Sequence, residues 1–370
     1  MLLAVAFGKG LQHEIREKMA LPTGHISIEH FNNNRSGVAL KPMVIHTDLQ
    51  QNILDINGVT TIQPVTVKAG ILRTAQDFEG VLFKGVTSGY NWEQLSKFIT
   101  QGQLPDYTNK ISTEILMSEL LAKRLGYQLG DNAQVYFLKN ESRFNIRNFK
   151  ITGLFNSGYQ DFDKGYVFTD MRHFIKMNKW ESNQTGGYEV LVRDFEAIEA
   201  VNKKVYGQIP SVLDSTPITE KYAQVFQWLL LFDVNIRGII LIMIFIASVN
   251  MVTMILVLIL EKKHFIGLFK VLGADTASIR KIFIYKAVYI IGKGLLWGNL
   301  IGLVAIGVQY SFKVITLNPE NYYVNVAPVK LSFLYFMGLN IGTVLLCCVT
   351  LWLPTQLISR ITPAKILRMD

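Results

Sequence analysis

Three long apolar runs dominate the second half of the chain. They cover residues 238–260 and 331–353, which contain no charged side chain, and residues 291–312, which contain only Lys293. A helix needs about 20 mainly apolar residues to cross a bilayer, and each run reaches that length. The pattern therefore predicts three complete transmembrane helices, with the ammonium group of Lys293 extended from near one helix end to the interface.

A shorter apolar segment, residues 1–7, opens the chain. It is too short to cross a bilayer and lacks the basic start and cleavage site of a signal peptide. We interpret it as the outer end of a truncated first transmembrane helix; the alternative is a genuine chain start that lies at the membrane interface. After it, Leu11, Ile15 and Met19 repeat every four residues, which predicts an amphipathic stalk helix that ends at Pro22.

A second apolar stripe precedes the first complete span. Tyr222, Val225, Phe226 and Leu229 share one face of a helix expected over residues 219–232. The two stalks predict an outer region that rests close to the bilayer. They are either rigid levers or ordinary interfacial helices, and the pattern is compatible with both.

The residues before the first complete span alternate between strand-like and helix-like patterns, which is typical of a water-soluble α+β region. Strands are expected at residues 25–30, 59–68, 133–138, 144–155, 165–169 and 188–192. Helices are expected over residues 112–125 and 194–205. The sequence therefore predicts an α-helical membrane domain joined to a large α+β domain.

Composition and charge fix the class and the orientation. Charged residues make up 18% of the chain, against about 25% in typical soluble domains, and 50% of residues are hydrophobic. Residues 261–293 are rich in lysine and arginine, and the tail adds Arg360, Lys365 and Arg368. Short basic loops stay in the cytoplasm, so these segments are predicted inside, and residues 9–235 and 313–330 outside. The net charge of +9 is thus mainly a topology signal, and nucleic acid is not an expected partner.

Several chemistries are excluded. The two cysteines, Cys347 and Cys348, are adjacent in an apolar run, and no Cys/His spacing suggests zinc. No G-x-x-x-x-G-K-[ST] phosphate loop occurs, and the cytoplasmic segments are too short for a nucleotide-binding domain. We expect no catalytic residue, metal or cofactor in this chain, so any ATPase must be a separate chain that binds the ATP.

The cytoplasmic loop contains a short amphipathic helix between two spans. Its polar flank is Glu261, Lys262 and Lys263, Gly273 is a natural helix stop, and Asp275 can cap the next helix. The apolar face consists of Phe265, Leu268, Phe269 and Leu272. Such a helix suits either a groove on a soluble partner or the bilayer surface with its lysines on anionic headgroups, and both remain open.

Other candidate residues lie in the membrane spans. Gly294, Gly298 and Gly302 repeat every four residues, which favours close helix packing, with dimer contact or lipid gating as alternatives. A candidate wall for acyl chains consists of Met243, Ala247, Asn250 and Met254. Asn250 and Thr253 share one face, where an ordinary interhelical hydrogen bond is expected, with a cavity position as the alternative.

Two pairs of polar residues in the outer region do not predict chemistry. Asp161 and Asp163 lack an identifiable catalytic partner and are expected to be solvated turn residues. His25 and His30 face opposite ways on one strand and therefore make a poor metal pair.

The order and sequence of these elements resemble a known family. Residues 218–275, which end in EKKHFIGLFKVLGAD, look like the second transmembrane helix and coupling helix of the lipoprotein-releasing LolC/LolE permeases of ABC transporters, within the MacB/FtsX superfamily. The tail 361–368 is similar to the family's terminal P-x-x-x-L-R pattern. Residues 111–138 and 149–168 match its "L-G, x-x-G-D" and "F-x-I-x-G-x-F" elements.

The resemblance implies four spans per subunit, a periplasmic domain with porter-like and Sabre-like regions, and a dimeric unit of two identical or different permeases. It implies two copies of a partner ATPase, whose closure moves the coupling helices and, through the stalks, the periplasmic domains. This mechanotransmission at the bacterial inner membrane would push a lipoprotein to a periplasmic carrier. The turn at residues 139–147 lacks the proline of the hook by which some relatives recruit the carrier.

Two other functions remain as alternatives. An FtsX-like regulator of periplasmic cell-wall hydrolases is disfavoured because such regulators typically carry a smaller outer region. A MacB-like efflux component is disfavoured because that family fuses its ATPase to the same chain.

These observations divide the chain as follows: 1–21, end of the first transmembrane helix and stalk; 22–78, first porter-like segment; 79–182, Sabre-like insert; 183–218, second porter-like segment; 219–260, stalk and transmembrane helix; 261–281, coupling-helix loop; 282–312, transmembrane helix; 313–330, periplasmic loop; 331–358, transmembrane helix; 359–370, cytoplasmic tail.

Overall fold

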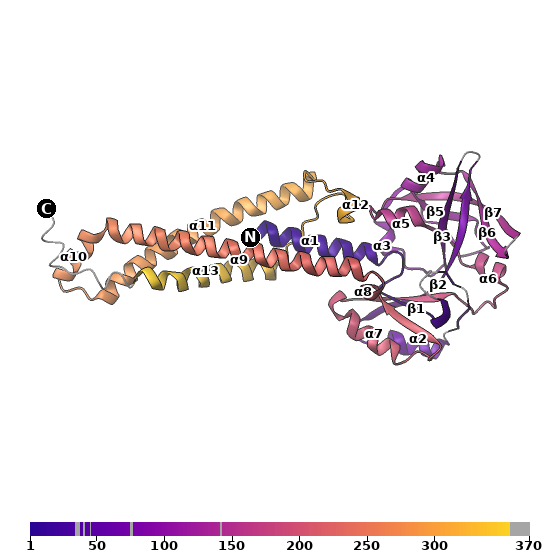
Figure 1. Ribbon diagram of the computed structural model, residues 1–370, viewed down its shortest axis with the longest axis horizontal. Coiled ribbons are helices and arrows are strands. Elements are labelled where there is room, and N and C mark those ends of the chain that lie inside the picture. Colours follow the sequence, from indigo (N-terminus) through magenta and orange to yellow (C-terminus); the bar gives the residue numbers. More distant parts are fainter. Residues whose placement is uncertain (34–37, 40, 45, 75–76, 141–142, 356–370) are drawn as a thin grey trace. The chain divides into compact units, whose positions relative to one another are not determined.

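The computed structural model describes residues 1–33, 38–39, 41–44, 46–74, 77–140 and 143–355 (Figure 1). It divides into two compact units. The membrane unit comprises Met1–Gln12, Trp228–Thr316 and the chain from Val326 onward, and the outer unit comprises His13–Gln227 and Leu317–Asn325. The cytoplasmic tail and two residues of the turn at 139–147 lie outside the described residues.

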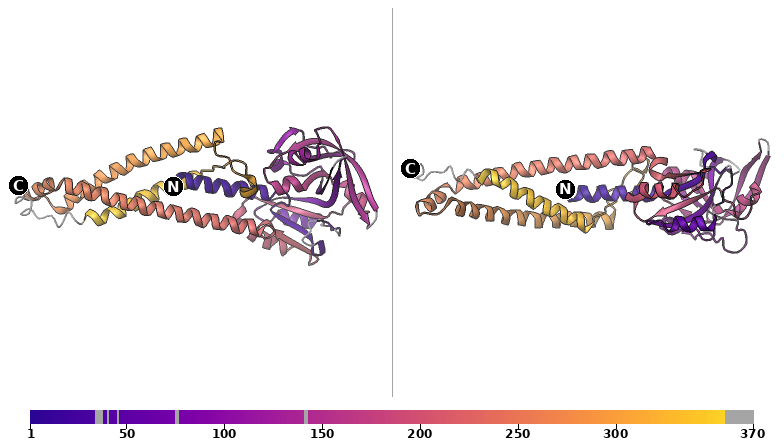
Figure 2. Two further views of the ribbon diagram at one scale, coloured as in Figure 1. Left: turned by 45° about the horizontal axis from the view of Figure 1, so that its top comes forward. Right: turned by 90° about the horizontal axis from the view of Figure 1, so that it is seen from below.

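The membrane unit is built from long helices. Three of the described helices are long and apolar enough to cross a membrane, namely α9 (Ala223–Glu261), α11 (Thr276–Phe312) and α13 (Phe333–Thr355). They contain the three predicted runs, and α1 (Leu2–Met19) contributes its first turns to this unit. The short helix α10 (Lys263–Val271) lies where α9 ends and α11 begins (Figure 2).

The outer unit is organised around one mixed sheet. Its strands are β1 (Ile26–His30), β2 (Val59–Arg73), β3 (Phe78–Val86), β4 (Ile99–Gly102), β5 (Glu114–Ser118), β6 (Asn132–Asn140), β7 (Arg143–Phe155), β8 (Tyr166–Asp170), β9 (Gly187–Val192) and β10 (Leu213–Pro217). The order is β10-β1-β9-β2-β3-β8-β5-β7-β4, and β6 pairs with both β2 and β7. The strands β2-β3-β8-β5-β7-β6 therefore form a ring, because β6 returns to β2.

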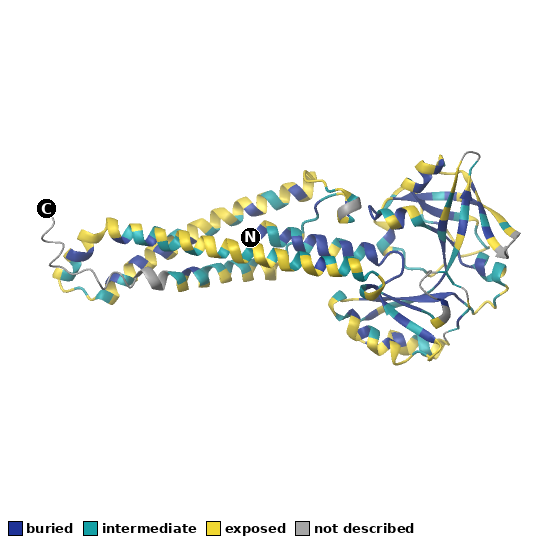
Figure 3. Cartoon of the chain, in the orientation of Figure 1, coloured by how far each residue is buried: buried dark blue, intermediate teal, exposed yellow. Residues whose placement is uncertain are grey.

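Short helices flank the sheet. They are α2 (Thr47–Leu54), α3 (Glu93–Ser96), α4 (Glu119–Leu125), α5 (Gln160–Gly165), α6 (Arg172–Asn178), α7 (Ile198–Tyr206) and α8 (Ile218–Lys221), with 3-10 turns at Phe31–Asn33 and Phe195–Ala197 and a further helix, α12 (Pro319–Tyr322), in the segment between α11 and α13. One core cluster fills the strand ring and includes Phe83, Phe137 and Phe149, whose rings are in contact. Buried residues concentrate on these strands, as Figure 3 shows.

The predicted helix over residues 112–125 is wrong in its first half. Glu114–Ser118 form β5, and Ile115, Leu116 and Met117 are fully buried. A short continuous apolar run fits a central buried strand as well as a helix, and pairing with β7 and β8 decides the outcome. The helix begins only at Glu119, where the Ser118 side chain accepts a hydrogen bond from the Leu121 amide.

The second stalk also differs from its prediction. The helix expected over residues 219–232 is interrupted at Tyr222, whose backbone (φ −115°, ψ 43°) is not helical, so α8 ends and α9 begins there. From Ala223 onward α9 is continuous to Glu261. In the first stalk, Leu11, Ile15 and Met19 are fully buried, as their spacing predicts.

Candidate coupling site and polar core of the outer unit

The end of α10 and the start of α11 are fixed by the residues that the sequence singles out. Gly273 adopts a left-handed conformation (φ +86°) and donates its amide to the Lys270 carbonyl at 3.1 Å, while the Ala274 amide donates to the Phe269 carbonyl at 2.9 Å. This hydrogen-bond pattern is that of a glycine-terminated helix. The Asp275 carboxylate then accepts from the Ala277 amide at 3.2 Å and starts α11. The loop therefore has a defined shape rather than an extended one.

One side of α10 is anchored and the other is open. Ile266 and Gly267 are buried, and Ile266 belongs to a cluster with Ile255 and Phe283 of the adjoining helices. On the other side, Phe265 and Leu268 are each 58% exposed. A large apolar face held outward on an anchored helix calls for a covering partner, either a protein groove or lipid.

The remaining coupling residues lie around that face. Leu272 is 73% exposed, and Phe269 is half-buried with its ring 4.7 Å from that of Phe265. The polar flank, Glu261, Lys262 and Lys263, is exposed, and the Lys262 ammonium lies 3.1 Å from the Glu261 carboxylate. Phe265, Leu268 and Leu272 are therefore exposed as a set, whereas Phe269 also packs against the cluster that anchors α10.

The candidate lipid-facing residues lie on α9, and the three glycines lie on α11. Met243, Ala247 and Asn250 are exposed on α9, and Met254 is half-buried. On α11, a methyl group added at Gly302 would lie 2.8 Å from the Leu2 side chain, whereas one added at Gly294 or Gly298 would meet no heavy atom within 4 Å. Helix packing at Gly294 and Gly298 thus stays a prediction about neighbours beyond this chain.

A polar contact that sequence reasoning missed joins two spans. The Asn299 side-chain amide on α11 donates to the Asn340 carbonyl oxygen on α13 at 2.6 Å. The Thr253 hydroxyl instead bonds within its own helix, to the Val249 carbonyl at 3.0 Å. Two asparagines in separate apolar runs are the only sequence signal, and nothing in their spacing pairs them.

The outer unit contains a buried ion pair that the sequence analysis also missed. Lys84 of β3 and Glu189 of β9 are almost fully buried, with 2.5 Å between the ammonium nitrogen and a carboxylate oxygen. Lys84 also donates to the Leu21 carbonyl and the Tyr90 hydroxyl, each at 3.1 Å, and the Gln63 amide donates to Glu189 at 3.2 Å. The network thus joins the segment after α1 to three strands.

Burial sets the protonation tendencies of this pair. It lowers the pKa of Lys84 and raises the pKa of Glu189, because both charged forms lose hydration, while each opposite charge counters the shift. A charge left unpaired here would be costly, so the two residues act as one structural unit.

The prediction that Asp163 is a solvated turn residue is wrong, whereas Asp161 is exposed as expected. Asp163 is buried and accepts hydrogen bonds from the Ser157 hydroxyl at 2.6 Å and the Gly158 amide at 3.1 Å. Burial raises its pKa. The turn at residues 157–159 has several backbone amides to satisfy, and a carboxylate folded back over them meets that need better than water does.

The segment Leu317–Asn325 belongs to this unit although it connects α11 with α13. Tyr323 contacts Tyr159 edge to face, with ring centroids 5.8 Å apart, and its carbonyl accepts from the Lys18 ammonium at 3.5 Å. Val324 is buried. The predicted periplasmic loop is therefore partly packed structure.

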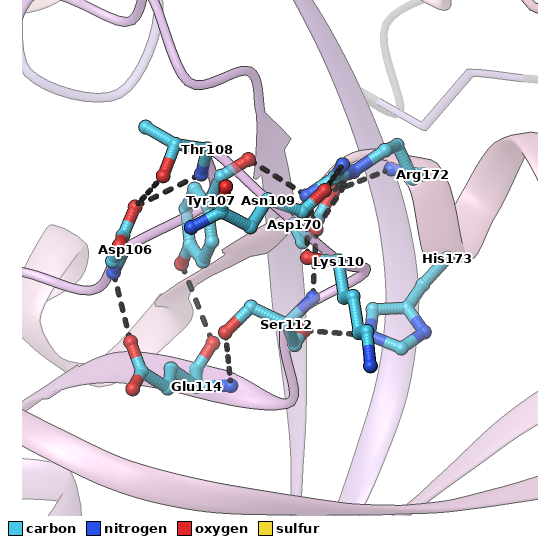
Figure 4. A network of polar contacts seen from close by, with 10 residues as sticks. All are labelled: Asp106, Tyr107, Thr108, Asn109, Lys110, Ser112, Glu114, Asp170, Arg172 and His173. Atoms are coloured by element: carbon cyan, nitrogen blue, oxygen red, sulfur yellow. Dashed lines mark hydrogen bonds and ion pairs between the residues drawn. The ribbon is translucent and has the colours of Figure 1, made fainter.

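A second polar network holds the loop before β5 (Figure 4). The Arg172 guanidinium bonds the buried Asp170 carboxylate, with a shortest N–O distance of 2.7 Å, and donates to the carbonyls of Tyr107, Asn109 and Lys110. The hydrogen bonds to Asp170 raise the Arg172 pKa. A planar guanidinium suits this many acceptors, and its role here is to fix a loop that has little regular structure.

Neither network resembles a catalytic or metal site. Among the described residues, no group of three or more His, Cys, Asp or Glu side chains is placed to hold a metal ion. The His25 ring instead accepts a hydrogen bond from the Val192 amide at its Nδ1 atom, at 3.0 Å. The arrangement is that of a protein with three helices that could cross a membrane and a structured outer unit, among the residues that the structure describes.

Comparison with known proteins places the chain in a family. The family model of the MacB-like periplasmic core domain matches residues 1–206, and that of the FtsX-like permease C-terminal matches residues 237–363. The chain therefore belongs to the MacB/FtsX superfamily of ABC transporter permeases, and the curated relatives that it matches include LolC and LolE proteins. This confirms the family expected from the sequence.

Individual relatives are distant but broad in coverage. The lipoprotein-releasing system transmembrane protein LolC of Haemophilus influenzae is 20% identical over 317 residues, which cover 83% of this chain and 77% of LolC. LolE of the same organism is 18% identical in an alignment that covers 99% of this chain and 90% of LolE. The periplasmic region of MacB from Actinobacillus actinomycetemcomitans is 14% identical, with a TM-score of 0.37, covering 56% of this chain and 95% of the MacB structure.

Proposed function

We propose that this permease releases lipoproteins from the bacterial inner membrane to a periplasmic carrier, driven by ATP hydrolysis in a separate ATPase. The observation that carries the coupling role is the anchored helix α10 with its open apolar face, bounded by Glu261 and Gly273. The lipoprotein cargo is supported by the names of the relatives LolC and LolE.

The proposed assembly contains two permease subunits, identical or different, and two ATPase copies that bind the ATP. In this proposal, the helix to which residues 1–7 belong forms a fourth span. The outer region divides into porter-like segments and a Sabre-like insert at residues 79–182. The candidate wall formed by Met243, Ala247, Asn250 and Met254 would face membrane lipid or cargo acyl chains.

Force would travel along α9. This helix runs without interruption from Ala223, in the outer unit, to Glu261, directly before α10. Because consecutive backbone hydrogen bonds make a helix stiff along its axis, a displacement of α10 on ATP binding would reach the outer unit with little loss. No alternating tunnel through the bilayer is needed for this mechanism.

Replacing Leu268 with aspartate tests the coupling role. Leu268→Asp places a carboxylate in the proposed groove contact, and we expect a loss of about 2–4 kcal/mol of binding, as for interface anchors. In proteoliposomes with the ATPase and a triacylated lipoprotein, both stimulated ATP hydrolysis and ATP-dependent release should collapse. The matched control is Ser278→Asp, which adds the same charge at an exposed position in the first turn of α11.

Two results would contradict the proposal. Leu268→Asp with unchanged ATPase stimulation and release would remove α10 from the coupling path. Labelling that places α10 on the same side of the membrane as the outer unit would exclude any contact between α10 and a cytoplasmic ATPase. Crosslinking followed by mass spectrometry separates the rival functions by the partner that is captured. Lipoprotein release predicts a lipoprotein, an FtsX-like regulator predicts a cell-wall hydrolase, and a MacB-like component predicts an efflux adaptor.

A further inference from the structure

The outer face of the strand ring is apolar where a solvent-facing sheet is normally polar. In the register of β2, β3, β6 and β8, Ile71 lies opposite Tyr136, and Leu82 lies between Ala69 and Tyr166. The alternate residues on these strands point into the core, so apolar side chains occupy both faces. Sheets with one solvated face usually alternate apolar and polar residues, which indicates that this face has an apolar occupant.

The β6–β7 hairpin extends this face into a groove. Leu138 lies opposite Phe144, and the two side chains are 56% and 52% exposed. Together with β2, β3 and the end of α5, they line a groove of about 680 Å³. Small-molecule sites usually measure about 300–1,000 Å³, so the groove is large enough to hold a ligand.

The side chains that line the groove limit the class of ligand that it can bind. None of the described residues that line the groove is basic, and its polar side chains are the Asp161 carboxylate and the hydroxyls of Tyr136 and Tyr166. The Arg73 guanidinium lies over the Tyr136 ring, 5.8 Å from its centroid, but it does not line the groove, so an anionic headgroup would meet the Asp161 carboxylate in the lining and no basic side chain there. A peptide would bring a donor and an acceptor with each residue, but β3 is paired with both β2 and β8 from Leu82 onward, which leaves only the short stretch Phe78–Val81, paired with β2 alone, to meet them. A hydrocarbon chain needs no such partner.

A second, smaller cavity adjoins the groove. Tyr166 lines both, and the wall of the smaller cavity includes Pro22 and Thr23, which follow the end of α1 at Met19 by three and four residues. We infer that the groove binds an acyl chain of the lipid-modified substrate during its passage through the outer unit. The identity of that substrate rests on the proposed function, whereas the groove itself does not.

Glycines in the lining provide a direct test. A side chain at Gly80 would meet no heavy atom within 4 Å, so Gly80→Phe fills the groove without disturbing the fold. The probe is a triacylated cysteinyl peptide with a diazirine near the end of one acyl chain, added to the full chain in lipid nanodiscs. We expect photo-crosslinks on β3, β6 and β7 that fall about tenfold in Gly80→Phe, which removes the burial of roughly two methylene groups.

Matched variants control for unspecific effects. Gly89→Phe adds the same side chain at an exposed glycine that also has open space and does not line the groove, and it should leave the crosslinks unchanged. Leu138→Asp should abolish them, while Gln134→Asp, exposed on the same strand, should not. Thermal unfolding of each variant confirms that the outer unit is intact.

Several outcomes would overturn the inference. These are wild-type crosslinks confined to the membrane helices, equal crosslinking of the groove by a diazirine-labelled peptide without acyl chains, and crosslinks in Gly80→Phe that match those of the wild type. Chain-to-chain crosslinks through Phe144 in the absence of probe would assign the face to a second copy and also overturn it.

The two proposals can fail separately. If lipoprotein release depends on this chain but the groove takes no probe, the inference falls and the proposed function stands. If the groove takes the probe but removal of the chain leaves lipoprotein release unchanged, the proposed function falls and the groove remains a lipid-binding site.

Discussion

The outer unit and the membrane unit differ in where they place large apolar side chains. In the outer unit, Phe83, Phe137 and Phe149 are fully buried within the strand ring. In the membrane unit, leucines such as Leu241 and Leu334 remain largely exposed. A domain in water must enclose its apolar surface, whereas helices in lipid gain nothing by burying leucine against leucine. The outer unit therefore encloses most of its large apolar side chains, whereas the membrane unit leaves many of its own to be covered by lipid or by other chains.

Their polar contacts differ in the same way. Lys84 and Glu189 share a network of several partners, while Asn299 and Asn340 form a single amide contact between two helices. The two buried charges of the outer unit are tolerated because hydrogen-bond partners and the opposite charge surround each of them. We expect the loss of one charge there to cost much more than the loss of the asparagine contact.

The largest effect is expected at the buried ion pair. Glu189→Leu leaves the Lys84 ammonium without its counter-charge and should lower the free energy of unfolding of the outer unit by about 3–5 kcal/mol. Adding Lys84→Met removes the stranded charge and should restore more than half of that loss. Chemical denaturation followed by intrinsic fluorescence measures both. A double variant no more stable than Glu189→Leu would show that the charge itself is not the cause.

A smaller effect is expected from His25 as the pH falls. Burial lowers the pKa of His25, and its Nδ1 atom accepts from Val192, so the folded state resists protonation. The unfolded chain takes up a proton below its ordinary pKa of about 6.5, and stability is therefore lost as the pH drops through that value. The slope contributed by this residue should reach at most about 1.4 kcal/mol per pH unit.

The variant His25→Asn isolates this contribution. Asparagine keeps an acceptor near the position of Nδ1 but does not titrate, so stability measured between about pH 5 and pH 7 should fall less steeply than in the wild type. Equal slopes in the two proteins would mean that His25 is not the titrating group.

The smallest effect is expected within the membrane. Asn299→Leu removes the hydrogen bond to Asn340, and such contacts between membrane helices average about 0.6 kcal/mol. Unfolding in mixed micelles should therefore change little. A loss above about 2 kcal/mol would indicate that the membrane unit, like the outer one, relies on a polar network.

The sequence predicted the membrane elements well because each depends on local composition. The spans, the end of α10 at Gly273 and the cap by Asp275 follow from runs and single residues within one turn. The strands β1, β2, β6, β7, β8 and β9 were also predicted, since their alternation is local. The ring they form was not, because pairing β6 with β2 joins residues far apart in the chain.

The outer site residues were harder to predict for the same reason. Nothing near Lys84 in the sequence indicates that Glu189 will meet it, and the carboxylate of Asp163 looks like a turn residue until its amide partners are known. The apolar face of β3 was missed because Gly80 and Leu82 read as an unremarkable short run. Such features are set by tertiary neighbours, which a single sequence does not display.

The packed segment Leu317–Asn325 changes how the chain connects the two units. The outer unit is entered from α1 and left through α9, but it also holds Tyr323 and Val324, in a segment that lies between α11 and α13. The chain therefore passes between the two units four times rather than twice. The outer unit is tied to α11 and α13 as well as to α1 and α9.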